Sequence, residues 1–121
     1  MQVGTEWIID ASGCRPEALR DAGLLGRLCQ RVLDELGLRL AGPAHWQRFP
    51  PPGGVTGLYL LTESHLTCHT WPELGVVAFN LFCCRARPRW PWETNLAELL
   101  GATRVRVQSL SRGATPPGGA S

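Results

Sequence analysis

Residues 62–73 of the chain read Thr62-Glu63-Ser64-His65-Leu66-Thr67-Cys68-His69-Thr70-Trp71-Pro72-Glu73. This segment holds two of the three histidines, two carboxylates, a serine and a cysteine. Short apolar runs flank it at residues 57–61 and 76–84, and such runs are typical of buried β-strands. Because polar segments carried between rigid strands often hold functional residues, we expect the candidate site here.

Spacing alone leaves several interpretations of this segment open. The odd-numbered residues from His65 to Trp71 would share one face of a strand. A metal site could use His65, His69 and Cys84, but the separated pairs of ligands found in structural zinc sites are absent. A serine hydrolase would need a strained turn such as G-x-S-x-G around Ser64, and the sequence there is Glu-Ser-His. The simplest alternative is a polar rim at the end of a β-sheet.

The segment closely resembles the self-cleaving junction of the prokaryotic S-adenosylmethionine decarboxylases, which are small pyruvoyl-dependent enzymes. The family pattern runs G-V-[ST]-G, a short apolar strand, E-S-H-[LI]-[ST]-x-H-T-W-P-E, another apolar strand and then a cysteine. This chain matches it with residues 54–57, residues 63–73 and Cys84. The likeness extends more weakly from about Trp7 to Gly113.

The resemblance implies that the chain cleaves itself between Glu63 and Ser64 into chains 1–63 and 64–121. The Ser64 hydroxyl would attack the carbonyl of Glu63 and convert the amide into an ester. The oxyanion that forms on the way needs a fixed donor, and the family's hydroxyl for this role corresponds to Thr56. The family's processing base corresponds to His69, because neutral imidazole accepts a proton near neutral pH. Elimination and hydrolysis would leave a pyruvoyl group in place of Ser64.

In the mature enzyme, the resemblance implies, the pyruvoyl carbonyl forms a Schiff base with the substrate's α-amino group and takes up electrons as carbon dioxide leaves. The family's proton donor to the product carbanion corresponds to Cys84, and a thiol with a reference pKa of about 8.5 stays mostly protonated. The sequence itself adds one independent fact, since all twelve basic residues are arginine and none is lysine. Pyridoxal phosphate chemistry through a lysine Schiff base is therefore excluded. We expect neither pyridoxal phosphate nor a metal as cofactor.

The substrate that the resemblance implies is S-adenosylmethionine, decarboxylated for the synthesis of polyamines such as spermidine. A glutamate corresponding to Glu73 would bind the ribose hydroxyls, an aromatic corresponding to Phe49 would stack on the adenine, and Leu66 would complete the substrate contacts. Two common family residues differ, since an acidic residue is Asn80 here and a tyrosine is Val76. Some members of the family are thought to decarboxylate ornithine or arginine, and these remain alternative substrates. A non-enzymatic, uncleaved regulator of an active paralogue is a further alternative.

Length and composition place limits on the remaining questions. The 121 residues suit one domain over residues 1–110, and the Gly, Pro, Ala and Ser of residues 111–121 predict a disordered tail. The net charge is +2, and the one arginine cluster, Arg85, Arg87 and Arg89, is expected to lie in a solvated loop. We therefore expect no nucleic acid and no membrane as partner.

Five cysteines without a scaffold-like spacing, and the lack of a secretory signal, favour reduced thiols in a cytoplasmic protein. The family pairs two processed protomers, so the resemblance also implies a homodimer with its active sites at or near the interface.

Periodicity along the chain predicts the elements that carry these residues. A helical stretch is expected from Pro16 to about Leu36, its regular part beginning near Asp21 as N-cap and ending at Gly37. A second helix is expected at residues 91–100, and a loop is expected around residues 45–49. Strands are expected at residues 5–10, 38–41, 55–61 and continuing at 65–71, 76–84 and 103–108.

The order of these elements predicts an α+β two-layer sandwich, in which helices pack on one face of an antiparallel β-sheet. The strands at residues 65–71 and 76–84 are close enough in sequence to pair, which would bring Cys84 to the start of the first of them. Neighbouring residues of a strand face opposite sides, so only one of Cys83 and Cys84 can face the site, and the family match favours Cys84.

Overall fold

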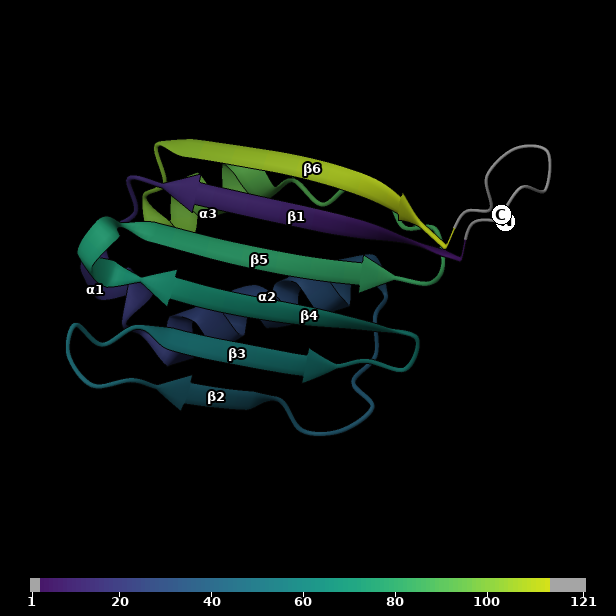
Figure 1. Cartoon of the computed structure of the whole chain (residues 1–121), viewed down its shortest axis with the longest axis horizontal. Coiled ribbons are helices and arrows are strands. Elements are labelled where there is room, and N and C mark those ends of the chain that lie inside the picture. Colours follow the sequence, from purple (N-terminus) through teal and green to yellow (C-terminus); the bar gives the residue numbers. More distant parts are fainter. Residues whose placement is uncertain (1–2, 114–121) are drawn as a thin grey trace.

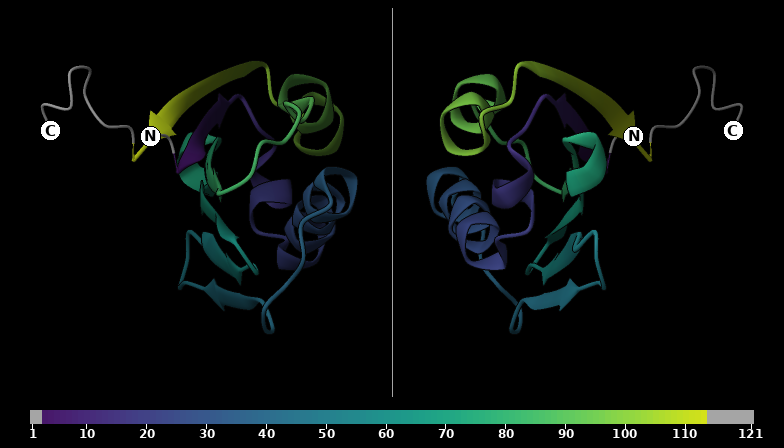
Figure 2. Two further views of the ribbon diagram at one scale, coloured as in Figure 1. Left: turned by 90° about the vertical axis from the view of Figure 1, so that its right-hand side faces the viewer. Right: turned by 90° about the vertical axis from the view of Figure 1, so that its left-hand side faces the viewer.

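Six β-strands form one antiparallel sheet in the order β2-β3-β4-β5-β1-β6 (Figure 1). The structure is a computed structural model that describes residues 3–113. The three α-helices of the described residues cover one face of the sheet and leave the other face open (Figure 2). The predicted α+β two-layer sandwich is therefore confirmed. The strands are β1 Gly4–Ser12, β2 His45–Arg48, β3 Val55–Leu60, β4 Ser64–Trp71, β5 Val76–Cys83 and β6 Arg104–Arg112.

The helices are α1 Pro16–Leu19, α2 Ala22–Leu36 and α3 Trp92–Leu100, with a 3-10 turn, η1, at Pro72–Leu74. As predicted, α2 begins after Asp21, whose carboxylate accepts a hydrogen bond from the N–H of Leu24 at 3.0 Å. It ends at Gly37, which takes a left-handed φ of 67°. The helical stretch expected from Pro16 is interrupted after Leu19. The carbonyl of Leu19 accepts a hydrogen bond from the hydroxyl of Thr70 at 2.7 Å and not from the next turn of a helix. Within residues 3–113, no helix combines the length and apolarity that crossing a membrane requires.

The hydrophobic core lies between these helices and the covered face of the sheet. Helix α2 supplies buried residues at the three- and four-residue spacing of one helical face. Strands β1, β3, β4 and β5 supply alternate buried residues to the same core, because successive side chains of a strand point to opposite faces. Members of the core from both layers include Ile9, Leu25, Leu28, Cys29, Val32, Leu66, Cys68, Val77, Phe79, Leu81 and Trp92.

The predictions for residues 38–49 are wrong. Residues 38–41 form only one isolated bridge, between Leu40 and Leu61. The strand lies instead at His45–Arg48, where a loop was expected. The indole of Trp46 explains this pairing: it lies over Gly57, where an added Cβ would come within 2.6 Å of the ring, and its Nε1 donates to the hydroxyl of Tyr59 at 3.1 Å.

The chain also departs from the predicted strand limits at two other places. Strand β4 does not continue the line of β3, because the chain reverses at Thr62 and Glu63 and β4 runs antiparallel beside β3. Strand β6 includes Ser111 and Arg112, which were expected to belong to the tail, since they pair with β1. The rest of the predicted tail, residues 114–121, lies outside the described residues.

Candidate active site

Glu63 and Ser64 lie at the bend between β3 and β4, at one end of the sheet. The N–H of Leu61 donates to the carbonyl of Ser64 at 3.0 Å and closes this bend. Ser64 pairs in register with Cys83 at the end of β5. The N–H of Cys84 then donates to the carbonyl oxygen of Glu63 at 3.3 Å. The prediction that strand pairing brings Cys84 to the start of the 65–71 strand is therefore confirmed.

The two adjacent cysteines face different surroundings, as predicted. Cys83 is buried, with 2% of its surface exposed, and Cys84 is exposed. Burial raises the pKa of the Cys83 thiol, and the positive charge of Arg87 opposes this rise. Cys84 is therefore the thiol that solvent or a small molecule can reach at this end of the sheet.

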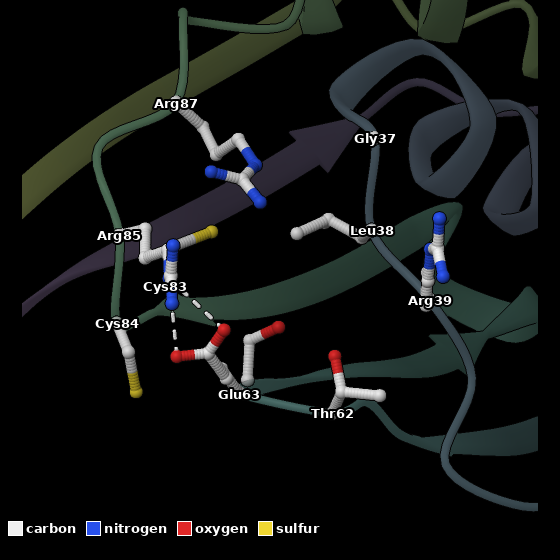
Figure 3. A pocket seen from close by; sticks show the side chains of 10 residues that line it. Gly37, Leu38, Arg39, Thr62, Glu63, Cys83, Cys84, Arg85 and Arg87 are labelled. Atoms are coloured by element: carbon white, nitrogen blue, oxygen red, sulfur yellow. Dashed lines mark hydrogen bonds and ion pairs between the residues drawn. The ribbon is translucent and has the colours of Figure 1, made fainter.

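A narrow cavity of about 20 Å³, room for about one water molecule, opens beside Ser64. It lies between the β4–β5 end of the sheet and the segment after α2 (Figure 3). The Nε of Arg85 lies 3.0 and 3.1 Å from the two carboxylate oxygens of Glu63. The Nε of Arg87 is buried and has no hydrogen-bond partner among the described residues. The segment is the exposed loop that was expected, with Arg85 and Arg89 exposed, and Arg85 and Arg87 also line this cavity.

Thr56 and His69 lie at the other end of the same pair of strands. They are cross-strand partners of β3 and β4, and Thr56 Oγ1 lies 2.9 Å from His69 Nδ1. The imidazole is exposed on the open face of the sheet, with its ring centroid 6.2 Å from that of Trp71. A hydroxyl and a base thus form one hydrogen-bonded unit on the open face.

This unit forms part of the lining of a cleft of about 400 Å³. Phe49, whose side chain is 48% exposed, and Trp71 supply aromatic surface to the cleft, and Glu73 of η1 supplies a carboxylate. A volume of a few hundred Å³ with aromatic surface and a few polar groups is typical of small-molecule sites. Of the predicted residues, the structure therefore brings Phe49, Thr56, His69 and Glu73 together, and we call them the cleft cluster.

The remaining predicted residues Glu63, Ser64 and Cys84 form a second group, the junction cluster. Ser64 and His69 are five residues apart in one extended strand, which separates them by roughly 17 Å. A single chain therefore does not bring the predicted base and the predicted nucleophile together. Thr56 is equally remote from the carbonyl of Glu63, because it is paired with His69.

Leu66 takes a place in the core and not in either cluster. Its side chain is 0% exposed, and its backbone lies in register between Tyr59 and Leu81 of the neighbouring strands. We therefore leave Leu66 out of the candidate site. His65 packs on the open face against Phe82, with ring centroids 5.7 Å apart. In residues 3–113, no three Cys, His, Asp or Glu side chains are grouped as metal ligands.

Sequence reasoning missed a polar cluster on the open face between β1, β5 and β6. Asn80 donates to the carboxylate of Glu6 at 2.6 Å, and Arg112 forms an ion pair with the same carboxylate. The hydrogen bond from Asn80 is the main cause that lowers the pKa of Glu6, and Arg112 adds to it. The amide at position 80, where the family pattern commonly has an acid, therefore lies beside a carboxylate from another strand.

The architecture has a counterpart among solved structures. It is similar to the crystal structure of the adenosylmethionine decarboxylase from Aquifex aeolicus, with a TM-score of 0.78 over 96% of this chain and 95% of that chain. At 22% sequence identity, this similarity shows the shared fold.

Sequence comparison gives the family. The sequence model of S-adenosylmethionine decarboxylase matches residues 5–113. A relative from Caldicellulosiruptor saccharolyticus is 33% identical over 113 residues, which cover 92% of this chain and 89% of the relative. A relative from Methanococcus maripaludis is 32% identical over 114 residues, or 93% and 91% of the two chains. Both carry the name S-adenosylmethionine decarboxylase proenzyme.

The chain belongs to the S-adenosylmethionine decarboxylase family. This confirms the resemblance seen in residues 63–73 and the predicted class of enzyme, a decarboxylase.

Proposed function

We propose that this chain is a proenzyme that cleaves itself between Glu63 and Ser64 and then decarboxylates S-adenosylmethionine for spermidine synthesis. The observation that carries the proposal is the geometry of the junction. The carbonyl of Glu63 is held by the N–H of Cys84 at 3.3 Å, at a bend where the Ser64 hydroxyl follows directly in the chain. Attack on the carbonyl would place negative charge on its oxygen, and a backbone N–H that already donates a hydrogen bond to this oxygen would stabilise that charge.

The residues present also fit a pyruvoyl group made from Ser64. When formed, the group supplies a carbonyl that takes up the electrons released as carbon dioxide leaves. No lysine is present to hold a pyridoxal cofactor for the same purpose. The thiol of Cys84 is exposed next to the residue that pairs with Ser64, so it can hold a proton for return to the product carbon.

The cleft cluster supports a nucleoside substrate over ornithine or arginine. Phe49 and Trp71 offer aromatic faces on which an adenine ring can stack, and the Glu73 carboxylate can accept hydrogen bonds from ribose hydroxyls. The same carboxylate attracts the positive charge of a sulfonium. Ornithine and arginine have neither an aromatic ring nor a ribose, so they would leave these groups without partners.

We further propose that two copies pair through the open faces of their sheets. A twofold axis that runs across the strands would lay the cleft cluster of one copy over the junction cluster of the other. This arrangement would bring the Thr56–His69 unit of one copy to the end of the sheet where the other copy carries its Glu63–Ser64 bond, whereas within one chain the two lie roughly 17 Å apart. The exposed side chains of Leu58 (48%), Leu60 (64%) and Trp71 (40%) on β3 and β4 supply apolar surface for such an interface.

The state of the cysteines supports a cytoplasmic location for this enzyme. All five cysteines fall within residues 3–113, and none of them forms a disulfide there. Four of the five are buried, and all are free thiols, as expected in a reducing compartment.

The first test is the mass of the freshly purified protein. We expect two chains, residues 1–63 and residues 64–121, with a pyruvoyl group at the start of the second, and we expect Ser64→Ala to stay whole. The second test is carbon dioxide release from S-adenosylmethionine, ornithine and arginine in parallel, with S-adenosylmethionine preferred. A single unbroken chain with an ordinary serine would overturn the enzyme proposal and favour an uncleaved regulator. A preference for ornithine or arginine would overturn only the substrate.

A further inference from the structure

Two arginines line the cavity beside the bond at which self-cleavage is proposed. Arg85 and Arg87 follow the end of β5 and belong to the lining of the cavity beside Ser64 (Figure 3). Arg85 pairs with the side chain of Glu63, and the N–H of Cys84, one residue earlier, holds the carbonyl oxygen of the same Glu63. One short segment, Cys84 and Arg85, therefore contacts both the side chain and the main chain of Glu63, the residue whose carbonyl would be attacked.

Arg85 can act on the first step of the reaction by positioning the carbonyl. In its ion pair with Glu63, the side chain of Arg85 is 69% exposed and that of Glu63 is 52% exposed. Ion pairs this exposed contribute little to overall stability. The same contact nevertheless restricts rotation of Glu63 at a bend, where small errors in geometry slow an intramolecular attack. Its effect should therefore be seen in the rate of cleavage and not in the melting temperature.

Arg87 can act on the second step, because that step releases an anion. Attack by the Ser64 hydroxyl first forms an ester and a free amino group. Removal of the Ser64 α-proton then breaks the Cβ–Oγ bond, so that Glu63 leaves as an α-carboxylate and residue 64 becomes dehydroalanine. Water hydrolyses the dehydroalanine to the pyruvoyl group and ammonia. The Nε of Arg87 has no hydrogen-bond partner among the described residues, and a guanidinium stays charged at every working pH.

We propose that Arg85 and Arg87 form an arginine pair that serves self-cleavage. Arg85 is a positioning residue that aligns the carbonyl of Glu63 for attack. Arg87 is the counter-charge for the carboxylate that leaves in the elimination. The inference rests on the proposed cleavage at Glu63–Ser64 and adds to it two residues that the family motif in residues 63–73 does not contain.

The test for Arg85 follows the appearance of the 64–121 chain with time after refolding. We expect Arg85→Ala to slow cleavage about three- to tenfold, as a misplaced reacting group does, and we expect Arg85→Lys to restore part of the rate. Arg89→Ala is a matched control, because Arg89, on the same segment, also forms a solvent-exposed ion pair, with Glu93 of α3. Glu63→Gln should slow cleavage by the same factor, and combining it with Arg85→Ala should add no further loss. Equal rates for Arg85→Ala and Arg89→Ala would overturn the positioning role.

The test for Arg87 detects the ester, which has the same mass as the uncut chain. Hydroxylamine cleaves esters, so treated Arg87→Ala should release a 64–121 chain that begins with serine and not with pyruvoyl. We expect elimination in this variant to slow by about tenfold or more, so that the ester accumulates, whereas Arg85→Ala should accumulate intact amide. An Arg87→Ala chain that matures at the normal rate, or that accumulates no ester, would overturn the counter-charge role.

These outcomes differ from failure of the proposed function itself. If the unmodified protein never cleaves and hydroxylamine releases nothing, self-cleavage is absent and both proposals fall. If the unmodified protein cleaves but the two variants match the Arg89→Ala control, only the role of the arginine pair falls. Thermal unfolding of each variant before cleavage checks that the substitutions leave the fold intact.

Discussion

Thr56 Oγ1 and His69 Nδ1 lie 2.9 Å apart across strands β3 and β4, at the end of that strand pair opposite to Glu63 and Ser64. The predicted oxyanion donor and the predicted base thus contact each other and not the bond they would help to break. One chain cannot use this arrangement for its own cleavage, but a second copy stacked with reversed strands can. The proposed self-cleavage therefore requires the proposed dimer.

We predict that cleavage can be restored by mixing two inactive variants. Ser64→Ala keeps His69 but has no nucleophile, and His69→Ala keeps Ser64 but has no base. If the base acts on the partner chain, co-refolding the two should give cleavage of the His69→Ala chain in mixed dimers. Each variant refolded alone is the control and should stay whole. Dimers that form in the mixture without any cleavage would show that His69 acts within its own chain.

We predict that Phe49 binds the substrate's ring. Phe49→Ala should raise the KM for S-adenosylmethionine by about fivefold or more, because stacking of a base on an aromatic side chain contributes roughly 1–3 kcal/mol. The rate of self-cleavage should stay normal, since cleavage needs no substrate. Steady-state kinetics of the matured variant measure the effect. An unchanged KM would remove Phe49 from the substrate site.

We predict that Leu66 acts through the core. Leu66→Ala should lower the free energy of unfolding by about 2–5 kcal/mol, as truncation of a buried leucine does. Leu40→Ala is the matched control, because Leu40 is 41% exposed and lies outside the proposed interface, and surface changes of this kind cost about 0.5 kcal/mol or less. Urea unfolding of both variants, each in the uncleaved Ser64→Ala background, gives the comparison. A loss at Leu66 no larger than that at Leu40 would contradict its place in the core.

We predict an acid-dependent contribution of Glu6 to stability. Because its pKa in the folded chain is lowered from the ordinary value of 4.5, chiefly by Asn80, folding favours the ionised form. The resulting stabilisation is fully present above pH 4.5 and is lost as the pH falls through the lowered pKa of the folded state. The stability difference between the chain and its Glu6→Gln variant should therefore be constant near neutral pH and shrink below pH 4.5.

Asn80→Ala provides the control for this assignment. Removing the amide should raise the pKa of Glu6 toward 4.5 and move the loss of stability to higher pH. Urea unfolding midpoints measured from about pH 3 to about pH 7, a range that brackets the ordinary pKa of a carboxyl group, would detect this shift. A difference between chain and Glu6→Gln that does not change with pH would contradict the lowered pKa.

Local patterns sufficed for most of the fold. Asp21 and Gly37 mark the ends of α2 because a capping carboxylate and a left-handed glycine act on their own neighbours in the chain. The apolar runs on both sides of the Glu-Ser-His segment form β3 and β5, which a local pattern of apolar residues also predicts. Strand β2 was not predicted, because it depends on the contact between Trp46 and Gly57 of another strand, and a local sequence pattern does not reveal such a contact.

The sequence by itself determined the family and the residue types of the proposed site, since the order of residues 63–73, Cys84 and the absence of lysine are properties of the chain alone. Only the tertiary structure decided that these residues divide into two clusters, that Leu66 belongs to the core, and that Arg85 reaches Glu63. The physical reason is the extended strand. In a strand, each residue advances the chain by roughly 3.3 Å and successive side chains point to opposite faces, so residues close in sequence are separated. Strand pairing, in contrast, brings together residues that are distant in sequence.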